Sequence, residues 1–322
     1  MAEYKGIHGT KVQDYTTDPD NPLTGQVWYN ETANTLKYFY VNPGSWATGG
    51  NLNTARYNLA GAGTQTAALA FGGWGPGAPN TGVTESYNGT NWTEVNDLNT
   101  GRNGLAGAGT NTAALAFGGD YPGTPEFFAG TETWNGTNWT EVNDLNTARK
   151  GMGGVGTNTA GLGFGGITIP GSYFSATETW NGTNWTEVND MNTARRSMGS
   201  AGTNTAALSF GGYPAPLGNT ESWNGTNWTE VNDMNTARLE LGSAGATNTA
   251  ALGFGGTSPT TGATESWNGT NWTAVSSMGT ARYGLAGAGT QTSALGFGGY
   301  FPAFNATEEW NQGPATVTIT TD

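Results

Sequence analysis

The sequence predicts an all-β protein built as a β-propeller, a ring of four-stranded sheets, and three observations support this prediction. A unit aligned on one arginine recurs six times, at steps of 43 to 47 residues. Each unit holds four short segments that read as strands, and five of the six units have an Asn-Gly pair between the last two. The first segment is rich in glycine and alanine, as expected where strands crowd around a central channel. A solenoid, the alternative architecture, does not explain that placement of small residues.

The strands of the first full unit illustrate the pattern. They are expected at residues 59–63, 67–73, 84–87 and 91–95. The second strand places Leu69 and Phe71 on one face and Ala68 and Ala70 on the other, so both faces are apolar, as in a sheet packed between two neighbours. The repeated Asn-Gly pair predicts a type I′ turn, in which both central residues need positive φ.

The unit boundaries divide the chain into an arm and a propeller. Full repeats are expected at 51–98, 99–145, 146–191, 192–234, 235–278 and 279–322, after an arm at 1–22. Residues 23–50 are expected to form a partial blade, because "NPGSW" at 42–46 aligns with the repeated "NGTNW". Seven blade positions are therefore favoured, and six blades with an N-terminal appendage is the alternative. The segment "ATVTIT" at 315–320 is expected to complete either the last blade or the first.

Composition excludes several classes of function. The chain has 24 acidic and 11 basic residues, a net charge of −13, which argues against a nucleic-acid partner. It has no cysteine, which excludes disulfides, thiolate catalysis and cysteine-based zinc sites. No apolar run approaches the roughly 20 residues that span a bilayer, so membrane insertion is not expected. Neither catalytic residues nor a metal or cofactor site is expected, and the only histidine, His8, lies in the arm.

Two sets of residues recur once in every blade. The arginines are Arg56, Arg102, Arg149, Arg195, Arg238 and Arg282, and the glutamates are Glu85, Glu132, Glu178, Glu221, Glu265 and Glu308. They are interpreted as a structural motif that holds the blades in register, since a functional site is usually unique, and a charged binding rim is the alternative. The tryptophan pairs, such as Trp134 and Trp139, are likewise interpreted as packing residues, with sugar-stacking platforms as the alternative.

The units differ most in the loop between the second and third strands, the B–C loop. The first three loops have 10–11 residues and the last three have seven. Their aromatic residues are the candidate binding site: Trp74, Tyr121, Phe127, Phe128, Tyr173, Phe174, Tyr213, Tyr300, Phe301 and Phe304. Exposed aromatics beside Asn, Ser and Thr suit sugar rings or a protein partner. In the alternative interpretation, these rings fold inward as lids over the blade edges.

The repeat resembles the kelch repeat over residues 51–313. The resemblance lies in "FGG" closing the second strand, Tyr or Trp ending the third, Trp five positions later, and Arg before the next unit. It implies a kelch-like propeller whose loop face commonly binds partners. The chain also resembles kelch-like structural proteins of tailed phages, particularly marine ones, through "MAEYKGIHGTKVQ", "GQVWYNETANTLKY" and "NTAR…GAGTQTAALAFGG". That resemblance implies a virion protein such as a tail fibre or decoration.

The expected function is therefore non-enzymatic adhesion by a virion protein on the particle surface or tail. The B–C loop face is expected to bind a host-surface glycan or receptor, and the N-terminal arm to contact other virion proteins, so that the particle sets the oligomeric state. A purely structural decoration or connector protein is the alternative, and a glycan hydrolase is a remote one.

Overall fold

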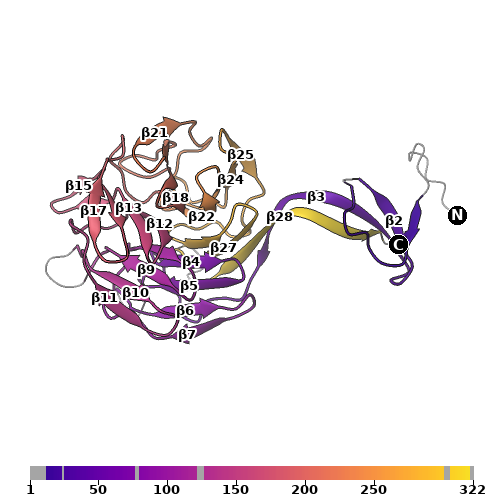
Figure 1. Cartoon of the computed structure of the whole chain (residues 1–322), viewed down its shortest axis with the longest axis horizontal. Helices are drawn as coiled ribbons and strands as arrows, with labels where there is room; N and C mark the ends of the chain where they lie inside the picture. The colour runs from indigo at the N-terminus through magenta and orange to yellow at the C-terminus, as the bar shows by residue number, and fades with distance from the viewer. Residues whose placement is uncertain (1–11, 24, 77–79, 122–126, 301–304, 320–322) are drawn as a thin grey trace. The chain divides into compact units, whose positions relative to one another are not determined.

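The computed structural model describes residues 12–23, 25–76, 80–121, 127–300 and 305–319, and within these ranges every regular element is a β-strand (Figure 1). The all-β prediction is confirmed. No helix in the described ranges is long and apolar enough to cross a membrane. The chain divides into two compact units, one of residues 1–44 with 312–322 and the other of residues 45–311. This division differs at both ends from the expected arm and propeller.

Six four-stranded arrangements make up the larger unit. The first two sheets hold β4 (Ala60–Thr64), β5 (Ala67–Phe71), β6 (Thr84–Tyr87) and β7 (Trp92–Val95), then β8 (Ala106–Gly109), β9 (Ala114–Phe117), β10 (Thr131–Trp134) and β11 (Trp139–Val142). The third and fourth hold β12 (Gly153–Thr157), β13 (Ala160–Phe164), β16 (Thr177–Trp180) and β17 (Trp185–Val188), then β18 (Gly199–Thr203), β19 (Ala206–Phe210), β20 (Thr220–Trp223) and β21 (Trp228–Val231). The fifth holds β22 (Gly242–Thr247), β23 (Ala250–Phe254), β24 (Thr264–Trp267) and β25 (Trp272–Val275).

The sixth blade contains β26 (Ala286–Gly289), β27 (Ser293–Phe297) and β28 (Thr307–Ile319), and its outer strand is β3 (Thr35–Thr48) from the other end of the chain. A small hairpin, β14 (Ile167–Thr168) with β15 (Ser172–Tyr173), lies in the third B–C loop. The strands expected for the first unit match β4 to β7 to within two residues. Sheet pairing within the blades is antiparallel throughout the described strands, as four-stranded repeat units require.

The inner strands of the blades contact one another in a closed cycle of β4, β8, β12, β18, β22 and β26, which Figure 1 shows around a central axis. The described strands thus form six blade positions. The seven positions favoured from the sequence are not confirmed by the described strands, and there is a physical reason. Residues 45–48 and the strands of the last repeat are each incomplete alone, and together they make one full sheet.

Trp46 shows how this closure works. It takes the position of the outer-strand tryptophan that the last repeat lacks, as the alignment of "NPGSW" predicted. It does so in the sixth blade, however, and not in a separate partial blade. Its ring lies 4.9 Å from Phe254 and 5.5 Å from Trp310 between centroids. Gly49 N also donates to Thr307 O at 2.9 Å. The expectation that "ATVTIT" supplies an outer blade strand was wrong, because β3 already occupies that place.

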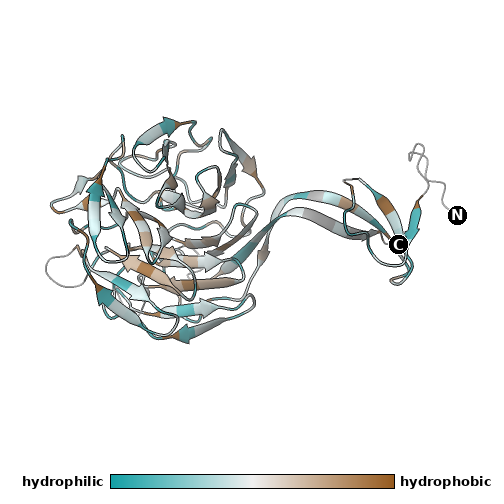
Figure 2. Cartoon of the chain, viewed as in Figure 1, coloured by the Kyte–Doolittle hydropathy of each residue, from teal (hydrophilic) through white to brown (hydrophobic). Residues whose placement is uncertain are grey.

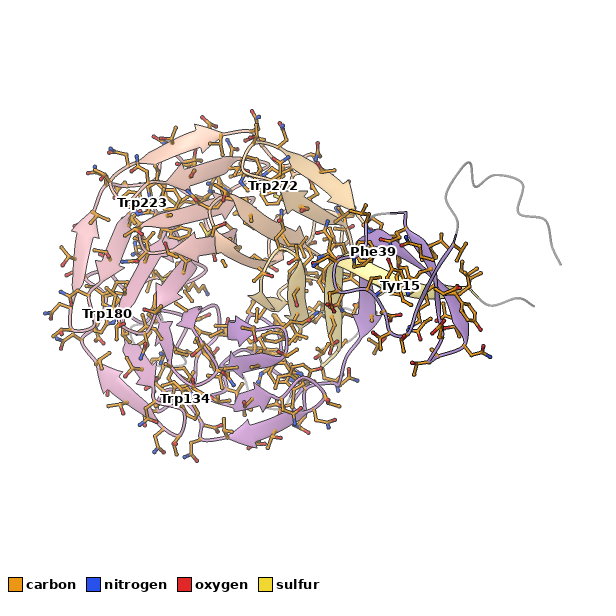
Figure 3. The ribbon with its side chains drawn as sticks, turned by 45° about the vertical axis from the view of Figure 1, so that its right-hand side comes forward. Tyr15, Phe39, Trp134, Trp180, Trp223 and Trp272 are labelled. Carbon is orange, nitrogen blue, oxygen red and sulfur yellow. The ribbon has the colours of Figure 1, made fainter. Side chains whose placement is uncertain are left out.

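Each outer-strand tryptophan joins its blade to the preceding one. Its ring contacts a phenylalanine of the preceding second strand at 4.7–4.9 Å between centroids. Its Nε1 donates to a threonine of the preceding third strand at 2.9–3.1 Å. Figure 3 labels the outer-strand Trp272 and, on the third strands of the three preceding blades, Trp134, Trp180 and Trp223, which lie around the ring. The packing interpretation of the tryptophans therefore holds for the described structure, since five of the six rings are buried between blades and the sixth, Trp46, is partly buried.

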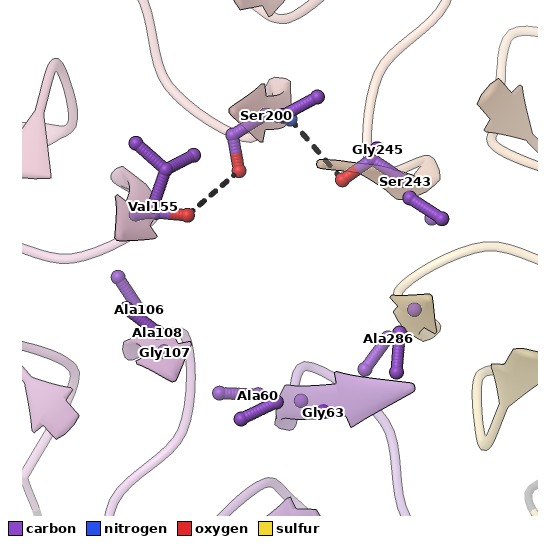
Figure 4. Close-up of a pocket in the computed structure, with 18 of the residues that line it drawn as sticks. Ala60, Gly63, Ala106, Gly107, Ala108, Val155, Ser200, Ser243, Gly245 and Ala286 are labelled. Carbon is purple, nitrogen blue, oxygen red and sulfur yellow. Dashed lines mark hydrogen bonds between the residues drawn. The ribbon is translucent and has the colours of Figure 1, made fainter. Parts of the chain in front are cut away.

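Small residues are required on the inner strands because neighbouring strands approach closely. A Cβ added to Gly107 would lie 2.7 Å from the Phe71 ring, and one added to Gly287 would lie 2.1 Å from Ser243 O. Figure 4 shows these strands around the central channel, where the Ser200 hydroxyl donates to Gly154 O at 3.1 Å. Apolar residues concentrate on the inner and second strands, while outer strands such as β7 and β17 carry hydrophilic segments (Figure 2).

The turn between the third and fourth strands differs from the type I′ turn predicted. In the third blade, the turn has four residues between the paired Trp180 and Trp185. Gly182 has φ of 90°, whereas Asn181 does not have positive φ. Instead, Asn181 Oδ1 accepts hydrogen bonds from the N–H groups of Thr183 and Asn184, both at 2.9 Å. The repeated asparagine is therefore needed for its side-chain oxygen, which stabilises the turn.

Replacing Asn181 with alanine is expected to lower the free energy of unfolding by about 1–2 kcal/mol, because two hydrogen bonds of the turn are lost. Urea denaturation of the full chain measures this change. Thr183→Ala in the same exposed turn is the control, and we expect it to change stability by less than about 0.5 kcal/mol. Equal losses in both variants would show that the asparagine oxygen does not hold the turn.

The smaller unit contains β1 (Gln13–Tyr15), which pairs in parallel with β2 (Val27–Asn30), and parts of β3 and β28. Asp18 organises it. Its carboxylate accepts hydrogen bonds from Trp28 Nε1 at 3.0 Å and Asn30 Nδ2 at 2.6 Å, and it pairs with Lys37 Nζ at 2.7 Å. The Lys37 and Asn30 hydrogen bonds lower the pKa of Asp18 to about 2. Residues 13–20 are thus part of a folded unit and not of a separate arm, and residues 1–11 of the expected arm lie outside the described residues.

Candidate functional site

The residues that differ between the repeats gather at one end of the channel, the loop face, which is formed by the B–C loops and by the segments that lead into each inner strand. The residue after each repeated arginine pairs with a residue at the start of the B–C loop of its own blade. These bridges join Tyr57 to Trp74, Asn103 to Asp120, Lys150 to Ile167, Arg196 to Tyr213, Leu239 to Thr257 and Tyr283 to Tyr300. Six similar backbone positions therefore present six sets of unlike side chains around one opening.

A ring of backbone hydrogen bonds, here called the collar, surrounds this opening. Its members are Asn58, Gly104, Gly151, Ser197, Glu240 and Gly284, and each N–H donates to the carbonyl oxygen of the member in the preceding blade at 2.7–2.9 Å. All six have φ between 52° and 65°. Three blades use glycine there, which adopts this conformation without strain. Because the collar is made of backbone alone, its side chains are free to differ from blade to blade.

The charged side chains at the opening lie on four consecutive blades, the second to the fifth. Lys150 Nζ pairs with Asp120 at 2.7 Å, and the Arg196 guanidinium lies 5.0 Å from the centre of the Tyr213 ring. Burial raises the pKa of Glu240, and the nearby charge of Arg196 opposes that shift. Within the described ranges, no side chain donates a hydrogen bond to the Glu240 carboxylate or forms an ion pair with it. Glu240 therefore brings a carboxylate to the opening, and the charge of Arg196 acts on it from the neighbouring blade.

Four aromatic rings, here called the quartet, lie together where the sixth and first blades meet on the loop face. The centroid of Tyr57 lies 5.2 Å from that of Trp74 and 5.3 Å from that of Tyr300, and Tyr283 lies 5.3 Å from Tyr300. With Pro76 they line one pocket. Tyr300 is 36% exposed and the other three rings are half-buried. The quartet thus presents aromatic surface from two blades to solvent.

The predicted loop aromatics have several different environments. Trp74 and Tyr300 belong to the quartet, while Tyr173 contacts Tyr213 at 5.5 Å. Phe301 and Phe304 lie outside the described residues.

The remaining loop aromatics pack inward. Phe127 is only 7% exposed, and the centre of its ring lies 4.8 Å from Lys150 Nζ. The prediction that Phe127 belongs to an exposed site was therefore wrong. Phe128 stacks on Tyr121 at 5.4 Å. Phe128 and Phe174 also cover buried arginines. The centre of the Phe128 ring lies 5.3 Å from Arg102 Cζ, and that of the Phe174 ring lies 5.5 Å from Arg149 Cζ. These rings act as lids over the blades, because each covers charge or apolar surface that would otherwise meet water.

The repeated arginines and glutamates form buried pairs and not an exposed rim. The distances are 3.3 Å for Arg56–Glu85, 2.6 Å for Arg102–Glu132, 2.9 Å for Arg149–Glu178, 3.2 Å for Arg195–Glu221, 3.0 Å for Arg238–Glu265 and 2.7 Å for Arg282–Glu308. In the third blade, Glu178 Oε2 also accepts from Asn146 N and Nδ2, both at 2.8 Å. The glutamate therefore fixes the segment that enters its blade, in agreement with the structural interpretation.

Sequence reasoning missed Tyr57, Tyr283, Arg196 and Glu240. A signal was present, since the two residues after the repeated arginine read Tyr-Asn, Asn-Gly, Lys-Gly, Arg-Ser, Leu-Glu and Tyr-Gly. This variation directly follows the most regular part of the unit. The B–C loops vary in length as well as in sequence, so their signal is the stronger of the two.

Comparison with known proteins supports the fold alone. No family model and no curated protein matches the chain. Among solved structures, it is similar to one titled "Structure of YjhT", with a TM-score of 0.68 and 11% sequence identity over 86% of this chain and 98% of that one. The fold is a kelch-like β-propeller. In the part of the chain that the structure describes, no group of three or more His, Asp or Glu side chains is placed to hold a metal ion.

Proposed function

We propose that this chain is a non-enzymatic binding protein whose loop face attaches to a host-surface glycan or receptor. The observation that carries this proposal is the quartet. The inter-blade contacts are repeated around the ring, but only the sixth and first blades combine tyrosines after the repeated arginine with aromatic residues in the facing loop positions. Aromatic rings of this kind stack on sugar rings or fill the centre of a protein interface.

The proposal extends to a role in a virion, on the particle surface or tail, which rests on the resemblance to phage structural proteins. In this proposal the N-terminal region contacts other virion proteins, and the particle sets the copy number. A folded unit at residues 12–44 suits such a role, because Asp18 ties its strands together through three side chains. Mass spectrometry of cross-linked particles would locate this unit, and cross-links confined to residues 45–311 would argue against it.

A structural decoration or connector protein is the second candidate, and the inward-packed loop rings favour it. Phe127, Phe128 and Phe174 stabilise the blades and leave less aromatic surface for a ligand. In that case the loop face contacts neighbouring virion subunits. A particle structure with the quartet covered by another subunit would support this candidate, and one with the quartet facing solvent would support adhesion.

Trp74→Ala combined with Tyr300→Ala is expected to reduce binding to host envelopes and to glycan arrays by at least about tenfold, because two aromatic surfaces of a binding centre are removed. Thr183→Ala, on the opposite face of the propeller, is the control and is expected to bind as the parent does. Circular dichroism shows whether the double variant is folded. Unchanged binding by a folded double variant would contradict adhesion through the quartet.

A further inference from the structure

The quartet has the composition and arrangement of an aromatic cage. Tyr57 contacts Trp74 at an interplanar angle of 53° and Tyr300 at 63°, while Tyr283 contacts Tyr300 at 51°. None of these three pairs is stacked flat, and the four rings line one pocket with Pro76. Ring faces carry partial negative charge, and a pocket walled by several of them attracts a cation.

A carboxylate, that of Glu240, lines the neighbouring central opening together with Asn58 and Gly284 and does not line this pocket itself. Glu240 O accepts the collar hydrogen bond from Gly284 N at 2.8 Å, which places Glu240 next to the residue that follows Tyr283. Burial raises the pKa of Tyr57 and Tyr283, and the charge of Glu240 adds to that rise, so Glu240 acts electrostatically on two rings of the quartet. A carboxylate close to aromatic faces further favours a positively charged ligand.

The basic groups of the opening lie on other blades. Lys150 and Arg196 belong to the third and fourth blades, and Lys150 is neutralised by Asp120. The sixth and first blades contribute Tyr57, Asn58, Tyr283 and Gly284 at the corresponding positions, none of which is basic. With a net charge of −13 on the whole chain, the field at the quartet favours cations over anions.

We propose that the quartet binds an alkylated ammonium group, such as the trimethylammonium of choline. An alkylated ammonium is weakly hydrated, so its burial against the rings costs little desolvation, and its positive charge meets the ring faces of the quartet. This inference rests on the proposed function and names the chemistry that the loop face recognises. A host surface can present the group as a lipid headgroup or as choline attached to a glycan, and both present the same cation.

Calorimetric titration of the full chain with choline tests the proposal, and saturable binding is expected. Trp74→Ala is expected to weaken it at least about tenfold. Glu240→Gln, which removes the charge and keeps the shape, is expected to weaken it about threefold. Tyr173→Ala removes a ring from the other loop-face aromatic pair, with Tyr213, and is expected to leave choline affinity unchanged.

The decisive comparison is with 3,3-dimethylbutanol, which has the shape of choline without its charge. Much weaker binding of the neutral compound is expected, and equal affinity for the two would overturn recognition of a cation. Absence of choline binding would also overturn the inference, and so would a loss of affinity in Tyr173→Ala equal to that in Trp74→Ala.

Two further arms identify the source of the ammonium group and separate this inference from the proposed function. Phosphatidylcholine vesicles and choline coupled to a soluble polysaccharide are offered to the parent chain, and binding to one of them assigns the carrier. If host envelopes bind through Trp74 but free choline does not compete, the ammonium inference fails and adhesion stands. If envelopes do not bind at all, adhesion itself fails.

Discussion

Replacing Glu178 with alanine is expected to lower the free energy of unfolding by about 3–5 kcal/mol, the cost of leaving a buried charge without its partner. The Arg149 side chain is fully buried and its Nη2 lies 2.9 Å from Glu178 Oε1. The same substitution removes the acceptor of Asn146 N and Nδ2. Burial already lowers the pKa of Arg149, and Glu178 opposes that effect, so its loss further disfavours the charged arginine. Guanidinium denaturation of the full chain measures the change.

Two controls separate the buried pair from ordinary surface charge. Asp120→Asn breaks the more exposed ion pair with Lys150, and it is expected to lower the free energy of unfolding by less than about 1 kcal/mol. The double variant Arg149→Met with Glu178→Ala is expected to recover part of the loss, because it no longer leaves a buried charge unpaired. If the two residues acted independently, their stability losses would add, and the double variant would be less stable than Glu178→Ala alone. That result would contradict a coupled pair.

Trp46→Ala is expected to lower the free energy of unfolding by about 3–5 kcal/mol. It is also expected to loosen the sixth blade more than replacing the outer-strand tryptophan of another blade loosens that blade. The ring contacts Phe254 and Trp310, and its Nε1 donates to Thr264 Oγ1 at 3.0 Å. In the sixth blade, the outer strand is not joined by a turn to the third strand, so side-chain packing and strand pairing alone hold it. Faster amide exchange at residues 45–52 is the expected sign of loosening.

Trp139→Ala is the matched control for this prediction. Trp139 makes the same contacts in the second blade, with Phe71 at 4.9 Å and Thr84 Oγ1 at 3.1 Å, but its strand follows the third strand through a short turn. A similar loss of stability without local release of residues 139–142 is expected. If both variants release their outer strands equally, chain closure through β3 does not depend on Trp46.

Much of the fold followed from the sequence because the repeats align six independent copies of one pattern. The small inner strand, the Asn-Gly turn and the strand bounds of the first unit were predicted to within two residues. The turn type was wrong because the dipeptide fits two turns, and only the structure shows Asn181 Oδ1 accepting two backbone N–H groups. The seven blade positions favoured from the sequence were not confirmed, because strand pairing between chain ends leaves no periodic signal in sequence.

The site was harder to predict because periodicity marks the scaffold and not the ligand. Aromatic residues in loops were the right chemistry, yet Phe127 packs inside and Phe128 covers Arg102. Whether an aromatic ring of a loop is exposed or packs over a buried arginine depends on the three-dimensional arrangement of the loop, which the sequence pattern does not give. Tyr57 and Tyr283 join Trp74 and Tyr300 only because the ring brings the first and last blades together.

Hydrogen–deuterium exchange of the full chain, with and without host envelopes, tests the central claim that the loop face at the sixth and first blades is the binding surface. Slower exchange is expected in the segments around Tyr57 and Trp74 and around Tyr283 and Tyr300, where a ligand on the quartet would cover backbone bridges. Slower exchange confined to the turns at 88–91, 135–138 and 181–184 on the opposite face, or to residues 13–44, would contradict it.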